Sequence, residues 1–188
     1  MSQSPVTASV SLHSSTVRIY LAHGASGNID TVRPWTNALR QLGLDAQPVA
    51  LPKGSAERAV TVYQDLVDRD ARASGRDPSA DLVIGGHSFG GRVASMVAAE
   101  QQMRGLILLS YPLHRPGHPE QLRVDHWPAI GCPVLVLSGE SDPFARIDLL
   151  RKHVRALPNA ELFTYPGVGH GLAKVMDDAV DRIVEFLS

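Results

Sequence analysis

The sequence predicts an α/β fold in which a mostly parallel central sheet is flanked by helices on both faces. Short apolar runs of strand length alternate along the chain with longer segments of helical spacing, which is the pattern of a parallel sheet with crossover helices. The runs are almost entirely apolar, as expected for strands covered on both faces. A chain of 188 residues also has enough material for one domain with its own core.

The first part of the chain supplies two strand–helix units. Residues 1–15 are polar and rich in Ser and Thr, so we expect a flexible N-terminal arm or a weak edge strand there, followed by a single domain over 16–188. The predicted elements are a strand at 17–22, a helix at 29–42, an extended segment at 44–51 and an amphipathic helix at 55–73.

The second part continues the alternation with one exception. The predicted elements are strands at 82–84, 106–109, 134–137 and 161–165, and helices at 89–103, 145–157 and 172–187. The exception is an irregular connection at 111–131, which contains several Pro, Gly and His residues. A connection of this length is usually functional or hides short helices, so it is a candidate mini-cap in a fold without a separate lid domain.

Composition and charge exclude several classes of protein. The net charge of −1, without a polybasic block, gives no support for nucleic-acid binding. One cysteine, Cys132, excludes an intramolecular disulfide framework and a cysteine-based zinc site. The apolar runs are far shorter than the roughly 20 residues of a membrane span, and no secretory signal is visible. We therefore expect a cytoplasmic protein that binds neither nucleic acid nor membrane; nothing in the sequence decides whether it forms a homo-oligomer.

The most informative motif is the G-x-S-x-G sequence at 86–90. It follows the predicted strand at 82–84 and opens the predicted helix at 89–103, which is the strand–turn–helix setting of a nucleophile elbow. Glycines two residues before and after Ser88 relieve crowding in the sharp turn. Ser88 is therefore the candidate nucleophile, and its Oγ is expected at the carboxyl edge of the sheet.

A serine nucleophile needs a base and an orienting carboxylate. Asp142 follows the strand at 134–137, and His170 follows the strand at 161–165, in the order Ser, acid, His. We assign His170 as general base and later acid, and Asp142 as the group that fixes the His170 tautomer. Glu140 is the alternative acid, although a solvated loop position explains it more simply.

An oxyanion hole requires two N–H donors near the nucleophile. The backbone N–H of Phe89, directly after Ser88, is the first candidate. The second is the Ala25 N–H in the glycine-containing loop at 23–27, which follows the first strand.

Further residues are candidates for substrate contacts, and each has a simpler structural explanation. Ser26 lies in the oxyanion loop; Arg92 could bind an acidic substrate group or be a solvated or structural residue; Trp127 could line the pocket or fill the core. His114 is a further candidate, but His114, His118 and His126 are best explained as exposed loop histidines rather than a metal site. His23 and His87 are expected to brace the oxyanion loop and the elbow. No metal and no cofactor is expected.

The sequence resembles the α/β-hydrolase superfamily over nearly its whole length. The segments that carry the resemblance are Gly-His-Ser-Phe-Gly-Gly at 86–91, Ser-Gly-Glu-Ser-Asp-Pro-Phe at 138–144 and Gly-Val-Gly-His at 167–170. Within the superfamily it is similar to the small dienelactone-hydrolase-like group. More narrowly, it resembles the family of a testis-expressed vertebrate protein and a non-specific-lethal chromatin-complex subunit, on the segments at 23–27, 111–117 and 120–123. Dienelactone hydrolases use a Cys nucleophile, and Ser88 at this position argues against that reaction.

We therefore expect a serine hydrolase of small acyl esters or thioesters with an open site. The same machinery also serves amide and C–C bonds, and the physiological substrate stays open. The alternative is a non-catalytic, hydrolase-like module that binds a protein partner, as the chromatin-complex resemblance implies; a complete set of candidate catalytic residues in the expected order weighs against it.

Overall fold

The computed structural model describes residues 17–157 and 159–188, so the expected arm at 1–15 lies outside the described residues. Within the described part, six strands form one sheet in which every neighbouring pair is parallel, in the order β2-β1-β3-β4-β5-β6. The strands are β1 (Arg18–Ala22), β2 (Asp45–Val49), β3 (Leu82–His87), β4 (Gly105–Leu109), β5 (Val134–Gly139) and β6 (Ala160–Tyr165). The predicted parallel sheet is confirmed.

Helices connect and cover these strands. The α-helices are α1 (Arg33–Gln41), α2 (Ala56–Ser74), α3 (Pro78–Asp81), α4 (Phe89–Glu100), α5 (Ile147–Val154) and α6 (Met176–Leu187), with short 3-10 turns η1 (Ile29–Thr31), η2 (Trp127–Ala129) and η3 (Ala173–Val175). Helix α3 was not predicted; it begins at Pro78 behind an Asp77 side chain that accepts a hydrogen bond from the Ser79 N–H at 2.9 Å. The helix after β3 was predicted to reach residue 103, whereas α4 ends at Glu100.

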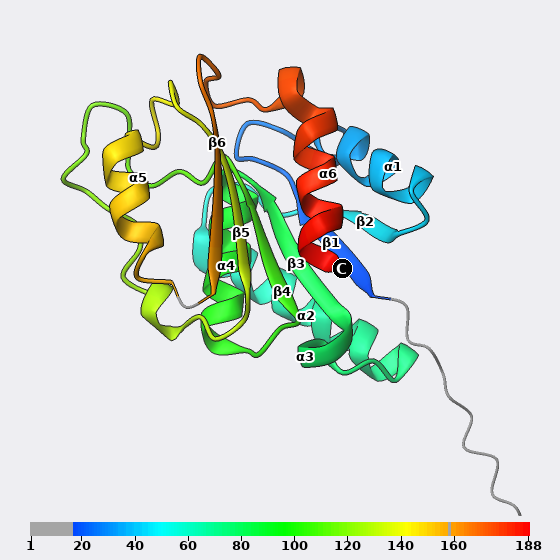
Figure 1. The fold of residues 1–188 in the computed structure, drawn as a ribbon. Coiled ribbons are helices and arrows are strands. Elements are labelled where there is room, and N and C mark those ends of the chain that lie inside the picture. Colours follow the sequence, from blue (N-terminus) through cyan, green and yellow to red (C-terminus); the bar gives the residue numbers. More distant parts are fainter. Residues whose placement is uncertain (1–16, 158) are drawn as a thin grey trace, which may run out of the picture.

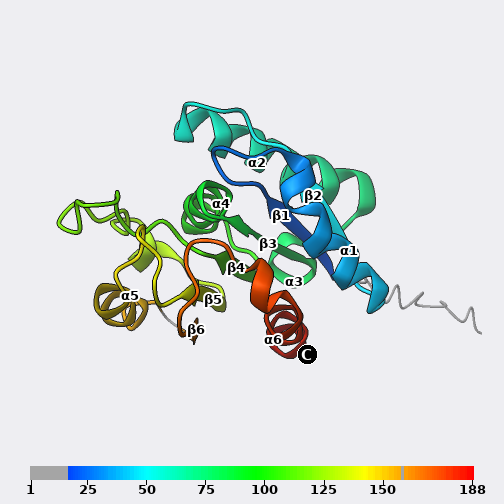
Figure 2. The ribbon, with the colours of Figure 1, turned by 90° about the horizontal axis from the view of Figure 1, so that it is seen from above.

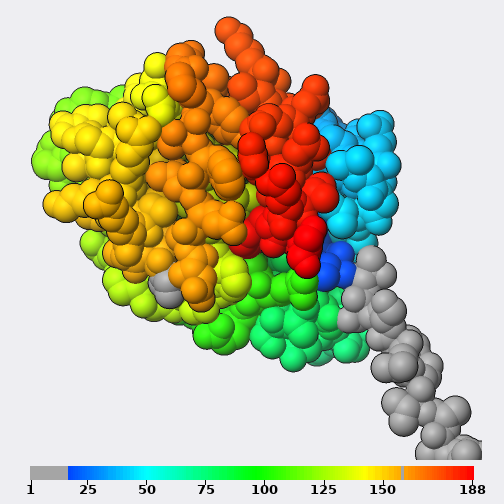
Figure 3. Space-filling view, in the orientation of Figure 1, coloured from blue at the N-terminus to red at the C-terminus, as the bar shows by residue number. Residues whose placement is uncertain are grey.

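The helices form two layers around the sheet, as Figures 1 and 2 show. Helices α2, α4 and α5 pack on one face, and α1 and α6 pack on the other. Each layer has its own apolar core, and the central strands are buried on both faces. Figure 3 shows α6 and β6 spread over one side of the molecule. Burial of both strand faces explains the nearly continuous apolar runs in the sequence.

The strand order creates the place where a site can form. The chain passes from β1 outward to β2, then returns with β3 to the other side of β1 and proceeds outward to β6. The order therefore reverses between β1 and β3, and the loops that leave these two strands diverge. Such a switch point at the carboxyl edge of a parallel sheet opens a crevice suited to ligands.

The connection at 111–131 is irregular but anchored. It contains η2, in line with the expectation of a hidden short helix, and buries Tyr111 and Trp127, whose rings meet edge-on with centroids 5.0 Å apart. The Tyr111 hydroxyl donates to the Arg123 carbonyl at 2.6 Å, and the Arg123 N–H donates to the Leu113 carbonyl at 2.9 Å. Among the described helices, none is long and apolar enough to cross a membrane.

Candidate active site

Ser88 lies in a strained turn between β3 and α4. Its backbone has φ 53° and ψ −116°, a region that non-glycine residues rarely adopt. The Ser88 N–H donates to the Leu109 carbonyl at 2.8 Å, which ties the turn to the end of the neighbouring strand β4. The surrounding sheet thus holds this serine in a costly conformation at the start of a helix.

Two glycines make the turn possible. A Cβ added at Gly86 would lie 2.5 Å from the Ala22 carbonyl oxygen, and one at Gly90 would lie 2.7 Å from the His23 carbonyl oxygen. Both contacts are with backbone of the β1 strand and the loop after it, which cannot move aside cheaply. The steric reason for the G-x-S-x-G spacing is therefore confirmed: the turn packs directly against the end of β1.

Ser88, His170 and Asp142 form a hydrogen-bonded chain. His170 Nε2 lies 2.8 Å from Ser88 Oγ, and His170 Nδ1 lies 2.8 Å from Asp142 Oδ2. A carboxylate only accepts, so the Nδ1–H donates to Asp142 and leaves Nε2 to accept from the Ser88 hydroxyl. The other Asp142 oxygen accepts from the Phe144 N–H at 2.8 Å, and the Asp142 side chain is fully buried. The bond from the Phe144 N–H therefore fixes the orientation of the carboxylate, and the carboxylate fixes the imidazole tautomer.

The alternative acid points elsewhere. The Glu140 carboxylate accepts from Arg151 at 2.7 Å and from the Thr164 hydroxyl at 2.8 Å. Both partners are away from His170, so Asp142 is the acid that the geometry places next to the imidazole.

The loop after β1 lies against the elbow. A Cβ at Gly24 would come within 3.1 Å of His87 Nδ1 and 3.5 Å of the Ser88 Cβ. His23 is buried and braces this loop as expected: its Nδ1–H donates to the Gly24 carbonyl at 2.7 Å, and its Nε2 accepts from the Leu51 N–H at 3.1 Å. The loop backbone is thus fixed close to Ser88. That the Ala25 and Phe89 N–H groups point at a shared oxyanion position stays a prediction.

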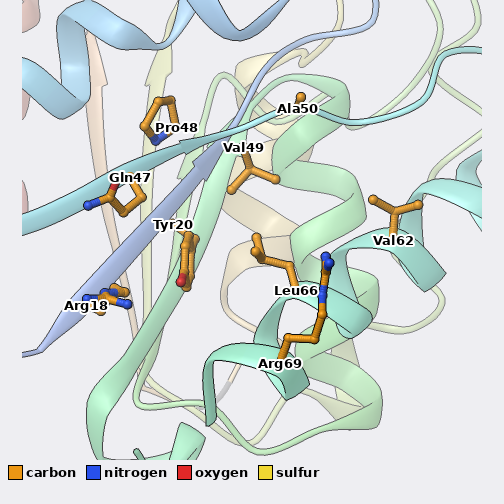
Figure 4. Close-up of a pocket in the computed structure, with 9 residues that line it drawn as sticks. All are labelled: Arg18, Tyr20, Gln47, Pro48, Val49, Ala50, Val62, Leu66 and Arg69. Atoms are coloured by element: carbon orange, nitrogen blue, oxygen red, sulfur yellow. The ribbon is translucent and has the colours of Figure 1, made fainter. Parts of the chain in front are cut away.

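A cavity of about 410 Å³ opens beside Ser88. Its lining comes from the loop after β1, the elbow, and the loops after β5 and β6: Gly24, Ala25, Ser26, Gly27, Thr31, His87, Ser88, Phe144 and His170. A depression of similar volume lies at the β2 edge of the sheet, between β1, β2 and α2 (Figure 4), and contains none of the candidate catalytic residues. Of these two cavities, only the one beside Ser88 is lined by candidate catalytic residues.

Comparison with known proteins agrees with the fold. Residues 52–182 match the model of a family described as an alpha/beta hydrolase domain. The chain belongs to this family.

Solved structures of similar fold include a monoacylglycerol lipase from Paleococcus ferrophilus (15% identity, 90% of this chain and 93% of that chain, TM-score 0.73). Others are an alpha-beta serine hydrolase homologue from Coxiella burnetii (18%, 92% and 86%, 0.73) and Est1E from Butyrivibrio proteoclasticus with ferulic acid bound (17%, 93% and 91%, 0.72). At these identities the likeness establishes the fold alone.

Of the candidates for substrate contacts in this alpha/beta hydrolase domain, only Ser26 lines the cavity. Trp127 is 1% exposed and packs in the core on the α4 side, and Arg92 is half-buried on α4 outside the cavity lining. The core explanation of Trp127 therefore holds, because η2 buries its ring against Tyr111.

His114 corrects an expectation. It was expected to be an exposed loop histidine, and this was wrong: His114 is 3% exposed. Its Nδ1–H donates to the Arg115 carbonyl at 2.8 Å, and its Nε2 accepts from the Arg146 N–H at 3.0 Å. The ring therefore joins the connection at 111–131 to the loop that carries Asp142. His118 is exposed beside Glu120, and the half-buried His126 bonds Ser95 instead.

Two residues of the hydrolase site had no role assigned from sequence. Phe144 lies against His170 with ring centroids 4.4 Å apart, and Thr31 lines the cavity. Phe144 directly follows Asp142-Pro143, so its position next to the candidate acid was the available signal. His87 supports the same region, since its Nε2–H donates to the His170 carbonyl at 3.0 Å. Burial lowers the pKa of His87 and so favours the neutral ring beside His170.

Proposed function

We propose that this alpha/beta hydrolase domain is a serine hydrolase of small acyl esters or thioesters. The observation that carries the proposal is the Ser88–His170–Asp142 chain, with two contacts of 2.8 Å and its serine in a strained elbow. Ser88 combines φ 53° with ψ −116°, and backbone strain of this kind concentrates at functional sites. The monoacylglycerol lipase and the serine hydrolase homologue of similar fold support the same assignment.

The proposed reaction follows from the roles of the three side chains. Ser88 Oγ attacks the acyl carbonyl while His170 Nε2 takes its proton, and Asp142 stabilises the imidazolium that forms. The N–H groups of Phe89 and Ala25 hold the oxyanion. His170 then protonates the leaving oxygen or sulfur. In the second half of the reaction, water attacks the acyl-enzyme while His170 takes its proton, and His170 returns that proton to Ser88 Oγ as the acid leaves.

Small substrates fit the dimensions of the site. The cavity beside Ser88 measures about 410 Å³, which is near the lower end of the sizes usual for small-molecule pockets. Within the described residues, the connection at 111–131 contains a single 3-10 turn rather than a lid domain. We therefore propose short or protruding acyl groups as the preferred substrates.

A fluorophosphonate probe tests the proposal. The wild-type protein should be labelled, and Ser88→Ala and His170→Ala should not be. Ser74→Ala, an exposed serine on α2, serves as the matched control and should label like the wild type. A folded wild-type protein that resists labelling would contradict the proposal and leave the partner-binding module as the better explanation. Labelling that survives Ser88→Ala would refute the choice of nucleophile.

A pair of acid variants tests the role of Asp142. Asp142→Asn should lower kcat by about 10⁴-fold, because the amide no longer stabilises the productive imidazole tautomer. Glu140→Gln, whose native carboxylate contacts Arg151 and Thr164, should retain kcat within about twofold. The reverse ranking, measured with para-nitrophenyl esters, would move the acid role to Glu140. Rates that rise steadily with acyl length would contradict the preference for small substrates.

We also propose a narrower place within the superfamily, among the small dienelactone-hydrolase-like proteins and near the testis-expressed and non-specific-lethal-complex proteins. The segments at 23–27 and 111–117 support it. In the structure the first borders the cavity, and the second contains His114, which braces the loop of the candidate acid. These segments distinguish this chain more sharply than the elbow, which many hydrolases share.

A further inference from the structure

Phe144 is held in place by backbone hydrogen bonds. Its N–H donates to Asp142 Oδ1 at 2.8 Å, and its carbonyl accepts from the His114 N–H at 3.0 Å. The same buried histidine also accepts from the Arg146 N–H through its Nε2 at 3.0 Å. The backbone at residue 144 therefore has little freedom, and the turn that carries the candidate acid also determines where the Phe144 ring lies.

The Phe144 ring lies against the imidazole of His170. The two ring centroids are 4.4 Å apart and the planes meet at 36°, so the rings turn their faces largely toward each other. The pair of Tyr111 and Trp127, at 61°, shows the edge-on alternative in the same molecule. The face of a phenyl ring carries partial negative charge, and a cation within about 6 Å of its centroid is attracted to it. The Phe144 ring is therefore placed to attract a positive charge on His170.

The edge of the imidazole is already occupied. Nδ1 lies 2.8 Å from Asp142 Oδ2 and Nε2 lies 2.8 Å from Ser88 Oγ, and ring nitrogens form such bonds near the plane of the ring. Among the described residues, the titratable side chains in contact with His170 are Asp142 and His87. The His87 ring centroid is 5.2 Å away, and burial lowers the pKa of His87 and favours its neutral ring. His87 therefore adds little positive charge that would oppose an imidazolium.

A phenyl face matters most while His170 is charged. Under the proposed function, His170 Nε2 takes the proton of Ser88 Oγ as the serine attacks, so the imidazolium forms with the transition state. The attraction of the phenyl face is for a cation, and the neutral imidazole of the resting site gains little from it. An interaction that is stronger in the transition state than in the ground state raises the rate.

We propose that Phe144 is a positioning residue of the Ser88 site and that the face of its ring stabilises the imidazolium of His170. The proposal rests on the proposed serine hydrolase function and adds a residue that acts through the candidate base. Asp142 and Phe144 stabilise the same positive charge from two directions, the carboxylate at the edge of the imidazole and the phenyl ring at its face. The Asp-Pro-Phe sequence at 142–144 supplies both groups from a single turn.

The pH dependence of kcat/KM tests the role of the ring. Phe144→Leu keeps an apolar side chain beside the imidazole but removes the aromatic face. Because the imidazolium is then less stable, the acidic limb of kcat/KM for para-nitrophenyl acetate should move to lower pH by about 0.5 unit, and the plateau should fall by about two- to fivefold. Loss of apolar cover alone acts in the opposite direction, since water that reaches the imidazolium stabilises it. An acidic limb that stays in place, or moves to higher pH, overturns the proposal.

Fluorinated side chains separate the charge of the ring from its shape. Mono-, di- and trifluorinated phenylalanine at position 144 withdraw electrons stepwise from the ring face while its volume changes little. The acidic limb should therefore move stepwise to lower pH, and the trifluorinated protein should approach the profile of Phe144→Leu. Identical profiles in the three fluorinated proteins and the wild type would overturn the proposal, whatever the result with Phe144→Leu.

Phe163→Leu is the matched control. Phe163 is a half-buried residue of β6 whose ring centroid lies 4.6 Å from the guanidinium carbon of Arg182, so the substitution removes a ring–cation contact that does not involve His170. It should leave the acidic limb in place. The position of the limb does not depend on the amount of active protein, and titration with the fluorophosphonate corrects the plateau for that amount. A limb that moves as far in Phe163→Leu as in Phe144→Leu would contradict a specific role of Phe144.

An NMR titration separates the two proposals when no ester is turned over. The Cε1–H signal of His170, assigned by its absence from His170→Gln, should reach its titration midpoint at lower pH in Phe144→Leu than in the wild type or in Phe163→Leu. Such a shift without esterase activity or fluorophosphonate labelling would uphold the effect of the ring on His170 and contradict the proposed serine hydrolase function. Equal midpoints in the wild type and Phe144→Leu would contradict the role of Phe144 whatever the outcome with esters.

Discussion

Two loops leave the carboxyl edge of the sheet, and they are built differently. The loop at 23–31 is short and shapes the cavity beside Ser88 with backbone, since Gly24 and Gly27 leave no room for side chains beside His87 and Thr31. The connection at 111–131 is long, lies outside the lining of that cavity, and is held by buried side chains such as Tyr111 and Trp127. The comparison teaches that glycine and backbone make the wall of the cavity near Ser88, whereas packing in the core fixes the longer segment.

Both loops nevertheless use the same device to hold their position. His23 and His114 are buried, and each donates from Nδ1 to the carbonyl of the following residue and accepts at Nε2 from a backbone N–H of another loop. Each ring accepts from a backbone N–H that no helix or strand pairs. The difference between the loops therefore lies in whether they line the cavity.

The largest effect is expected for the core anchor of the connection. Trp127→Ala should lower the free energy of unfolding by about 3–5 kcal/mol, because it leaves a cavity beside Tyr111. Trp127→Phe should cost far less, since it keeps the edge-on ring contact and removes an indole N–H that has no partner among the described residues. Urea denaturation measures both. Equal losses in the two variants would show that the connection does not depend on this ring packing.

The next effect concerns the backbone wall. Gly24→Ala should lower kcat by about 10²-fold, because the added Cβ would lie 3.1 Å from His87 Nδ1 and displace the loop that carries the candidate oxyanion donor Ala25. Gly117→Ala is the control in the other loop: Gly117 has φ 77° and open space around it, so the substitution should cost about 1 kcal/mol of stability and leave kcat unchanged. Equal effects of the two substitutions on kcat would contradict this difference between the two loops.

A smaller effect is expected at the histidine that joins the connection to the acid loop. His114→Ala should destabilise the fold by about 1–3 kcal/mol, because the Arg146 N–H loses its acceptor. His118→Ala, at an exposed position four residues later, should change the unfolding free energy by less than about 0.5 kcal/mol. If the two substitutions had equal effects, the burial of His114 would have no energetic consequence.

The smallest effect is the dependence of stability on pH. Burial lowers the pKa of His87 at the elbow and of His126 in the connection. A depressed histidine pKa gives stability that is complete above the ordinary value of about 6.5 and is lost as pH falls through the folded-state pKa, since the unfolded chain then binds more protons. His87→Gln and His126→Gln should each flatten the decline of unfolding free energy on acidification. An unchanged slope in both variants would contradict these pKa directions.

The candidate catalytic residues could be predicted because the signals for them lie close together in the sequence. Ser88 was identifiable as the candidate nucleophile because the motif spacing, the preceding strand and the following helix all lie within a few residues. Asp142 and His170 were identifiable as candidate acid and base because each follows a strand. The preference for Asp142 over Glu140 agrees with the turn, in which the shorter side chain can accept from the Phe144 N–H two residues on.

The sequence was uninformative where position depends on contacts between distant loops. The burial of His114 arises from packing against the loop at 142–146, which no periodicity encodes. The half-burial of His126 likewise depends on how the connection lies on α4, where His126 Nε2 contacts Ser95 Oγ.

The hydrogen bond between Ser88 and His170 spans 82 positions of the chain. Contacts between residues so far apart in the sequence form slowly during refolding, because closing the intervening chain costs entropy before the contact contributes any stability. The elbow can form with β1, β3 and β4 in place, whereas the contact of His170 with Ser88 also requires β6 to have joined β5. Under the proposed function, the recovery of Ser88 labelling by a fluorophosphonate after dilution from denaturant should therefore follow the docking of β6.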